Sequence, residues 1–127
     1  MMNLFMMIIK FIYKNIIIFL IYIMKIIENN DLSSLKDKEC YLLFYFTAKW
    51  CGPCQKIKPL IEKLSEGADS SKLEIYLIDI DENDKIADEF KIRSVPTFYL
   101  YHKKELKGQT GGADIKKVKE LLKENMK

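Results

Sequence analysis

Two hydrophobic stretches dominate the pattern of apolar and polar positions in this chain. Residues 41–47 have the sequence Tyr-Leu-Leu-Phe-Tyr-Phe-Thr, and residues 73–80 have the sequence Leu-Glu-Ile-Tyr-Leu-Ile-Asp-Ile. Short runs of apolar, β-branched and aromatic residues are typical of strands that are covered on both faces. The pattern therefore predicts two buried strands at the centre of a sheet.

A helix is predicted to join these two strands. Behind the first strand, apolar residues recur three and four positions apart, at Ile57, Leu60, Ile61 and Leu64. Pro59 lies inside this helix and is expected to kink it. An order of strand, helix and strand implies a right-handed crossover and parallel pairing of the strands.

Shorter elements are predicted on either side. We expect a first strand at residues 25–27, a short helix at 32–36 that is capped from Asn29-Asn30-Asp31, and a helix at 84–90. Asn83 is the expected cap of that last helix.

The C-terminal part is predicted to form a hairpin and a helix. Residues 97–101 and 105–110 pair as antiparallel strands, and His102 is interpreted as a solvated residue of the turn between them. Asp114 starts the final helix, and its predicted inward face consists of Ile115, Val118, Leu121 and Leu122.

Residues 1–24 differ in composition from the rest of the chain. They contain no acidic residue, glycine or proline, and from Leu4 to Met24 only Lys10, Lys14 and Asn15 interrupt the apolar run. As a helix this run would be about 31 Å long, close to the thickness of a bilayer core. The two lysines would be costly inside a membrane.

A secretory signal accounts for these features better than a simple span. Residues 1–15 then form a positive n-region and residues 16–24 an apolar h-region, without a small-x-small cleavage site. This predicts a signal or membrane anchor over 1–24, with membrane association through residues 4–24 and a membrane or secretory location. The alternative is a start at Met24, which leaves a domain over 25–127 and a cytoplasmic location.

Composition and charge argue against some classes of fold and function. The 127 residues, 49% hydrophobic and 31% charged, suit one globular domain with a modest core. The net charge of +3 falls to +1 without Lys10 and Lys14, which gives no electrostatic case for nucleic acid binding. Three cysteines are an odd number, which argues against a framework of paired disulfides.

The motif that carries chemistry is Trp50-Cys51-Gly52-Pro53-Cys54, where the first buried strand gives way to a helix. Pro53 suits a first helical turn, because the N–H that it lacks would be unpaired there. The helix N-terminus favours negative charge, so the pKa of Cys51 is expected to be lowered. A Cys51 thiolate is the species that attacks a disulfide, and Cys54 is close enough to resolve the product.

Two other uses of the cysteine pair stay open at this point. A zinc site would need two further ligands, and only Cys40 and His102 remain, neither of them in a second paired motif. A purely structural disulfide is the other use, although an exposed helix start beside a Trp is an unusual place for one. Cys40 is interpreted as a bystander thiol.

The motif and its surroundings resemble the thioredoxin family from about Met24 to Met126. The positions that fall at the family's spacings are Ala48, Pro59, Asp79-Ile80-Asp81, Arg93-Ser94-Val95-Pro96-Thr97 and Gly111. The resemblance implies an α/β thioredoxin fold, with a central mixed β-sheet of about five strands flanked by about four helices. It also implies a protein-disulfide reductase with a reversible Cys51–Cys54 disulfide and no bound cofactor or metal.

The resemblance further implies a docking surface and partners. The Val95–Pro96 bond would be cis and would lie beside the cysteines, with the backbone of Val95 offered to a substrate chain. The surface around Cys51 would consist of Trp50, Gly52, Pro53, Val95, Pro96 and Gly111. The partners would be disulfide-containing proteins and an NADPH-dependent thioredoxin reductase that supplies electrons. Because Pro53 brings no positive charge, unlike the His of disulfide isomerases, it favours a reductant.

Three positions depart from the family pattern, and one of them is Thr47, where many members have an aromatic residue. Tyr45 stands where most thioredoxins have a buried Asp, and Leu77 stands where its partner Lys is found. The joint loss avoids a lone buried charge, but it removes the usual general base for Cys54. A Tyr with an ordinary pKa near 10 cannot replace that base at neutral pH. Our hypothesis is a slower reductase in which water carries the Cys54 proton.

Two other function classes stay open. A thioredoxin fold can serve as a docking subunit of a larger complex, in which the cysteines would be dispensable. If residues 1–24 form a secretory leader, a third possible function is that of a disulfide oxidase or isomerase of the secretory pathway.

Overall fold

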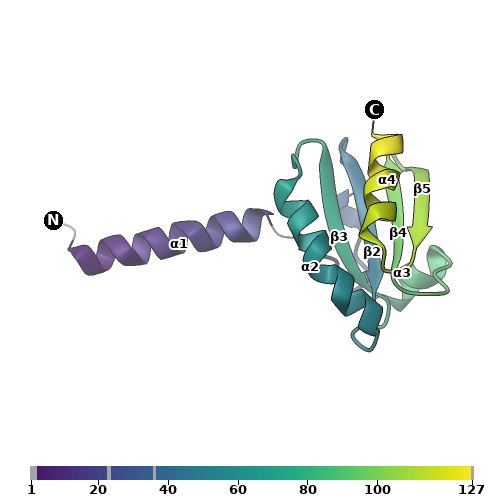
Figure 1. The fold of residues 1–127 in the computed structure, drawn as a ribbon, viewed down its shortest axis with the longest axis horizontal. Helices are drawn as coiled ribbons and strands as arrows, with labels where there is room; N and C mark the ends of the chain where they lie inside the picture. Colours follow the sequence, from purple (N-terminus) through teal and green to yellow (C-terminus); the bar gives the residue numbers. More distant parts are fainter. Residues whose placement is uncertain (1–2, 23, 36, 127) are drawn as a thin grey trace.

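The structure, a computed structural model, describes residues 3–22, 24–35 and 37–126, with side chains described outside 17–22. A five-stranded mixed sheet lies at its centre (Figure 1). The strands, in spatial order, are β1 (Lys25–Ile26), β3 (Leu73–Asp79), β2 (Tyr41–Thr47), β4 (Thr97–His102) and β5 (Glu105–Gly111). β3 pairs in parallel with β1 and β2, whereas β4 is antiparallel to β2 and to β5.

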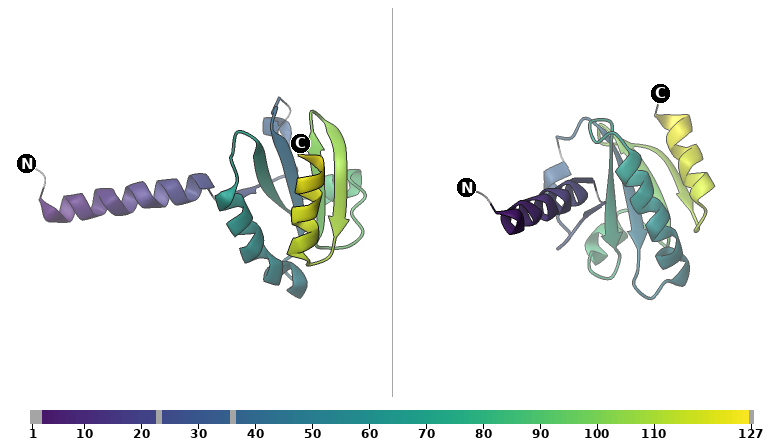
Figure 2. Two further views of the ribbon diagram at one scale, coloured as in Figure 1. Left: turned by 45° about the horizontal axis from the view of Figure 1, so that its top comes forward. Right: turned by 60° about the vertical axis from the view of Figure 1, so that its left-hand side comes forward.

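Helices cover both faces of this sheet in the described part of the chain. The helices are α1 (Leu4–Tyr22), α2 (Gly52–Gly67), α3 (Asp84–Glu89) and α4 (Ile115–Asn125), with a 3-10 helix, η1, at Ser33–Leu35. α2 and α4 pack on one face, and α3 and η1 pack on the other (Figures 1 and 2). The mixed sheet with four helices confirms the expected thioredoxin fold.

The alternation of side chains along β2 explains why its sequence is hydrophobic throughout. Leu43 and Tyr45 belong to the cluster under α2 and α4, whereas Phe44 and Phe46 belong to the cluster under α3. Successive strand residues point to opposite faces, and here each face meets a helix. Both central strands are therefore confirmed, although β3 ends at Asp79, one residue earlier than predicted.

The predicted inward face of the last helix is also confirmed. Val118 and Leu121 are buried in the cluster shared with α2, and Ile115 and Leu122 pack against it. The carboxylate of Asp114 accepts the backbone N–H of Lys116 at 3.0 Å, as expected for an N-cap.

The predicted hairpin turn is confirmed, but His102 closes it from the end of β4 as a half-buried residue and not as a solvated one. His102 ends β4, its ring stacks on Tyr41 with the ring centroids 4.0 Å apart, and its Nε2 lies 3.1 Å from the carbonyl oxygen of Glu39. The turn consists of Lys103 and Lys104, both with positive φ. Two consecutive positive φ values match the twist of a tight hairpin, so the two lysines perform a role usually given to Asn-Gly.

Two predicted helix caps differ in part from the structure. α3 begins at Asp84 with Asn83 as its N-cap residue, as predicted, but the side chain of Asn83 makes no cap hydrogen bond to the helix. It is fully buried, and its Nδ2 donates to the carbonyl oxygens of Ile27 and Asp79. The short helix expected at 32–36 is only the 3-10 turn η1, which Asp31 caps by accepting the N–H of Ser33. Residue 36 lies outside the described residues.

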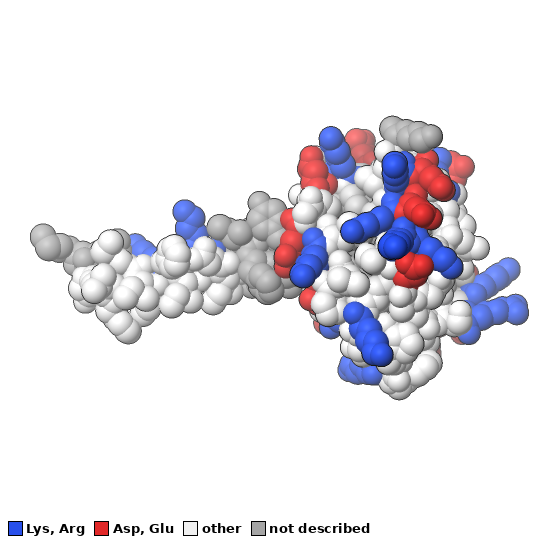
Figure 3. Space-filling view, in the orientation of Figure 1, with Lys and Arg blue, Asp and Glu red and all other residues white. Residues whose placement is uncertain are grey.

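The segment before the sheet forms one helix, α1, which runs away from the domain (Figure 1). Its described side chains are exposed, and its surface is mostly uncharged apart from lysines (Figure 3). No described helix has both the length and the apolar character needed to cross a membrane. Met24 is 5% exposed and packs in the core with Tyr45.

Candidate active site

The cysteine pair lies where β2 turns into α2. Cys51 is the N-cap residue with extended backbone angles, α2 begins at Gly52, and Pro53 lies in the first turn. The backbone N–H of Cys51 donates to the carbonyl oxygen of Ala48 at 3.2 Å, and the N–H of Cys54 donates to the Sγ of Cys51 at 3.2 Å. The predicted position at a helix N-terminus is therefore confirmed. The lowered pKa of Cys51 in the reduced protein stays a prediction.

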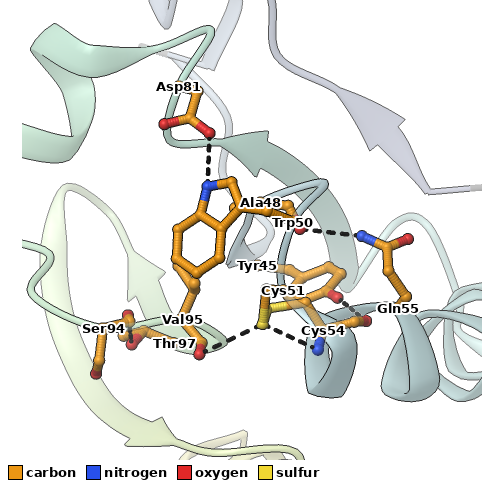
Figure 4. Close-up of a disulfide and its surroundings, with 10 residues drawn as sticks. All are labelled: Tyr45, Ala48, Trp50, Cys51, Cys54, Gln55, Asp81, Ser94, Val95 and Thr97. Carbon is orange, nitrogen blue, oxygen red and sulfur yellow. Dashed lines mark hydrogen bonds between the residues drawn. A yellow bond between two sulfur atoms is a disulfide. The ribbon is translucent and has the colours of Figure 1, made fainter.

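Cys51 and Cys54 form a disulfide, with their Cα atoms 5.3 Å apart (Figure 4). Cys54 is fully buried and Cys51 is 6% exposed, and both pack against Ala48. One sulfur of the bond is therefore close to the surface and the other is sealed beneath it. This asymmetry suits an attacking cysteine and a resolving cysteine.

The other two residues considered as zinc ligands lie elsewhere. Cys40 packs against the α3 face of the sheet, and His102 is stacked on Tyr41 at the end of β4. Burial raises the pKa of the Cys40 thiol, and the charge of Glu74 adds to the rise. Cys40 is therefore expected to stay a neutral thiol, consistent with a bystander.

The loop before β4 reaches the disulfide. The Val95–Pro96 peptide bond is cis, and the carbonyl oxygen of Val95 lies 3.7 Å from the Sγ of Cys51. Gly111 is the register partner of Thr97, and the N–H of Gly112 donates to the carbonyl oxygen of Pro96 at 3.0 Å. The structure thus brings Val95, Pro96 and Gly111 to the edge where Cys51 lies.

Trp50 forms the exposed rim of the site. Its side chain is 70% exposed, and its Nε1 donates to the Oδ2 of Asp81 at 2.9 Å (Figure 4). Gly52 and Pro53 are also exposed, and a side chain built at Gly52 would meet no atom within 4 Å. The space in front of the disulfide is therefore open to a large partner.

Asp81 and Asp79 are site residues to which sequence reasoning gave no role. Asp79 is buried, and its carboxylate accepts the backbone N–H groups of Asp81 and Glu82 at 2.8 and 3.3 Å. These two hydrogen bonds fix the loop after β3. Asp81, in this loop, accepts the hydrogen bond from the indole N–H of Trp50. The only signal in the sequence was the spacing of Asp79-Ile80-Asp81.

Tyr45 takes the place of the family's buried Asp and has a different role. Its hydroxyl donates to the carbonyl oxygen of Cys54 at 2.6 Å, and its ring stacks on Phe98 with the centroids 5.0 Å apart. Burial raises the pKa of Tyr45, and the charge of Glu62 adds to the rise. Tyr45 therefore stays protonated at neutral pH and acts as a donor, not as a base.

Gln55 ties the start of α2 to the preceding turn. Its Nε2 donates to the carbonyl oxygen of Ala48 at 3.0 Å (Figure 4). Together with the Tyr45 hydroxyl, this bond holds the Cys51–Cys54 turn from two sides. Neither contact could be read from the sequence, because each depends on how the turn folds back on β2.

The fold and the bonded cysteine pair at the head of α2 define a thiol–disulfide oxidoreductase domain. The chain belongs to the thioredoxin family, since the sequence model of that family, described as Thioredoxin, matches residues 23–126.

Individual relatives agree with this assignment. Over 95 residues, or 73% of this chain and 48% of the relative, the chain is 37% identical to "Thioredoxin O1, mitochondrial" of Arabidopsis thaliana. It is 37% identical to "Thioredoxin O, mitochondrial" of Oryza sativa, over 72% of this chain and 52% of that protein. The chain thus spans about half the length of these two plant relatives. The crystal structure of reduced Schistosoma mansoni thioredoxin superposes with a TM-score of 0.74 and 32% identity, covering 80% of this chain and 97% of that one.

Proposed function

We propose that this protein is a protein-disulfide reductase of the thioredoxin type. The observation that carries the proposal is the asymmetry of the disulfide, with a near-surface Cys51 at a helix N-terminus and a sealed Cys54. In the reduced protein, the Cys51 thiolate attacks a substrate disulfide, forms a mixed disulfide and displaces one substrate sulfur as a thiolate. Cys54 then loses its proton and attacks Cys51, which releases the second substrate sulfur. The substrate gains two electrons and the Cys51–Cys54 pair loses them.

The groups around Cys51 are proposed to bind the substrate, although the side chain of Pro96 is buried and that of Val95 is half-buried. The carbonyl oxygen of Val95 faces the Cys51 sulfur, which supports a role for this backbone in pairing with an extended substrate segment. Trp50, Gly52, Pro53, Pro96 and Gly111 surround this point and would form the rest of the contact surface. An open surface without a deep pocket suits folded proteins as substrates.

Two expectations about the cellular setting are also proposals. Electrons would come from an NADPH-dependent thioredoxin reductase, with no cofactor bound to the domain itself. Residues 4–24 would act as a leader or membrane-associated segment, which the exposed apolar side chains of α1, such as Phe5 and Phe11, support. Membrane flotation of the full chain beside a variant that starts at Met24 tests the second point. Equal flotation of the two proteins would contradict membrane association through residues 4–24.

The function is tested with the full chain, NADPH, a thioredoxin reductase and insulin as the disulfide substrate. We expect NADPH oxidation that Cys51→Ser abolishes. Cys54→Ser should instead accumulate a mixed disulfide, visible by mass spectrometry. Cys40→Ser is the matched control and should keep full activity, because this thiol lies on the other face of the sheet. Unchanged turnover in Cys51→Ser would favour a docking role for the fold.

A further inference from the structure

A cavity of about 400 Å³ lies behind the active site, between α2 and the β1–β3 edge of the sheet. Thr47, Ala48, Gln55, Lys58 and Glu62 contribute to its wall, and we call it the rear cavity. Ala48 packs against the two cysteines and also lines the cavity. A single residue layer therefore separates the cavity from the disulfide.

Thr47, on the wall of the rear cavity, has a sealed hydroxyl group that lacks a partner among the described residues. Thr47 is 5% exposed, and among the described residues nothing pairs with its Oγ1. A buried hydroxyl without a hydrogen bond is costly, and ordered water is its usual partner where a protein group is lacking. The cavity is many times larger than a single water molecule requires. Water that moves in from the cavity beside the Thr47 side chain would supply the missing partner.

The resolving step needs a route for one proton. Cys54 is fully buried and must become a thiolate while a substrate is attached to Cys51 and covers the front of the site. Tyr45 is the nearest titratable side chain behind Cys54, but it stays protonated and donates to the carbonyl oxygen of Cys54. The acceptor must therefore lie farther back, on the side of the cavity.

Glu62 is the carboxylate best placed to accept this proton. It lies about two turns after Cys54 on α2, is half-buried, and lines the rear cavity. Its charge is also felt at the Tyr45 hydroxyl, which contacts Cys54. No ion pair within the described residues engages Glu62.

The other charged groups that face the cavity are less suited to accept the proton of Cys54. The carboxylate of Asp79 accepts two backbone N–H groups, and Glu82 is paired with Lys49 at 2.9 Å. Glu28 is at the exposed rim. Lys58, one turn from both Cys54 and Glu62 on α2, also lines the cavity, and its spacing places a positive charge beside Glu62.

We propose that the rear cavity is the proton exit of the resolving cysteine, with Thr47 as the positioning residue for water and Glu62 as the acceptor. The proposal rests on the reductase function proposed above. The S–H bond of Cys54 breaks, its proton passes through water to the Glu62 carboxylate, and its electron pair forms the bond to the Cys51 sulfur. The bond between Cys51 and the substrate breaks, and the substrate leaves as a thiolate. Glu62 then releases the proton to solvent.

The experiment follows both steps of one turnover in the full chain. Reduced protein is mixed with the aromatic disulfide of thionitrobenzoate in a stopped-flow instrument. The first thionitrobenzoate released reports attack by Cys51, and the second reports resolution by Cys54. We expect the second rate of the parent protein to depend less steeply on pH between about pH 6 and pH 8 than direct ionisation of the thiol would require, because a general base assists the step.

In Glu62→Gln the second rate should fall about tenfold at pH 7 and rise about tenfold per pH unit, because only direct ionisation of the thiol remains. The first rate should be unchanged. Thr47→Val, which keeps the shape of the side chain, should slow the second release in the same selective way. Glu66→Gln is the matched control, since it changes the same residue type one turn farther along α2 on an exposed position.

The outcomes separate the two proposals. Equal second rates and equal pH profiles in the parent protein and Glu62→Gln would overturn the role of Glu62. A selective loss in Glu62→Gln without one in Thr47→Val would overturn the water route. If the parent protein releases the first thionitrobenzoate but never the second, resolution by Cys54 is absent, and the reductase function fails together with this inference.

Discussion

Tyr45 on β2 and Leu77 on β3 are register partners in the parallel ladder, and both side chains are buried in the core that α2 covers. The resemblance to the thioredoxin family places a buried Asp and its partner Lys at these two positions. In this protein the aromatic ring of Tyr45, stacked on Phe98, and the aliphatic side chain of Leu77 stand in place of that ion pair. An apolar exchange of both partners is compatible with stability, whereas loss of one partner alone is not.

The first prediction concerns restoration of this pair. Tyr45→Asp should lower the free energy of unfolding at pH 7 by about 3 kcal/mol or more, because it buries a charge and leaves a cavity. Burial raises the pKa of the new carboxyl in the folded state, so the loss should shrink as the pH falls and the group becomes protonated. Adding Leu77→Lys should recover part of the stability. Urea unfolding at pH 7 and pH 5 measures both effects, and a double variant no better than Tyr45→Asp would contradict the pairing.

A second prediction isolates the Tyr45 hydroxyl. Tyr45→Phe keeps the stack on Phe98 but removes the donor to the carbonyl oxygen of Cys54. The free energy of unfolding of the oxidised protein should fall by about 0.5–1.5 kcal/mol. Because this hydroxyl is a donor and not the base, the pH dependence of resolution should keep its shape. A change in that shape would show that Tyr45 takes part in proton transfer.

The third prediction concerns the hold of Asp81 on Trp50. Asp81→Ala removes the 2.9 Å hydrogen bond to the indole and frees an exposed ring. The freed Trp50 side chain must become ordered when a protein substrate binds. This cost should lower kcat/KM for a protein disulfide about twofold to tenfold. Glu82→Gln is the neighbouring control, because its ion pair with Lys49 is exposed at both ends and contributes little. Equal losses in the two variants would argue against a specific role for the Trp50–Asp81 contact.

A fourth prediction is a pH dependence of stability that arises far from the cysteines. The Glu74 carboxylate pairs with Lys25 and Lys38 at 3.0 and 3.2 Å and accepts the hydroxyl of Tyr76. Burial opposes its ionisation, yet these hydrogen bonds hold the pKa of Glu74 below its usual range. A lowered folded-state pKa stabilises the protein above the unfolded pKa, and this stabilisation is lost as the pH falls through the folded pKa.

Glu74→Gln should therefore lower the free energy of unfolding by about 1–2 kcal/mol at pH 7. The difference from the parent protein should shrink as the pH falls below about 4.3, the ordinary pKa of a Glu. Chemical denaturation at several pH values measures it. A difference that stays constant into the acid range would show that packing, and not charge, accounts for the effect.

The parts of this structure that the sequence predicted are those with a local physical cause. The β2 and β3 strands are hydrophobic throughout because helices cover both faces, and Cys51 and Pro53 mark a helix start through their own backbone preferences. The β4–β5 hairpin was predicted in the right place, but the conformation of its turn was not, because Lys103 and Lys104 adopt positive φ without Gly or Asn. Lysine has no preference for positive φ, so these two residues give no local signal for such a turn.

The finer parts of the site depend on segments that meet only after folding. The hold of Asp81 on Trp50 joins residues 31 positions apart, and the side chain of Asn83 bonds to Ile27, 56 positions away. The rear cavity likewise depends on the position of α2 over β3. Hydrophobic pattern and motif spacing carry no information on such contacts, because their partners are selected by the packing of the whole domain.

The central claim is that the Cys51–Cys54 pair serves as a reductant. The most direct test is its reduction potential in the full chain, measured by equilibration with glutathione redox buffers and trapping of free thiols. The account predicts a value near −270 mV, about that of a reducing thioredoxin. A value of about −180 mV or higher, in the range of disulfide isomerases and oxidases, would contradict it.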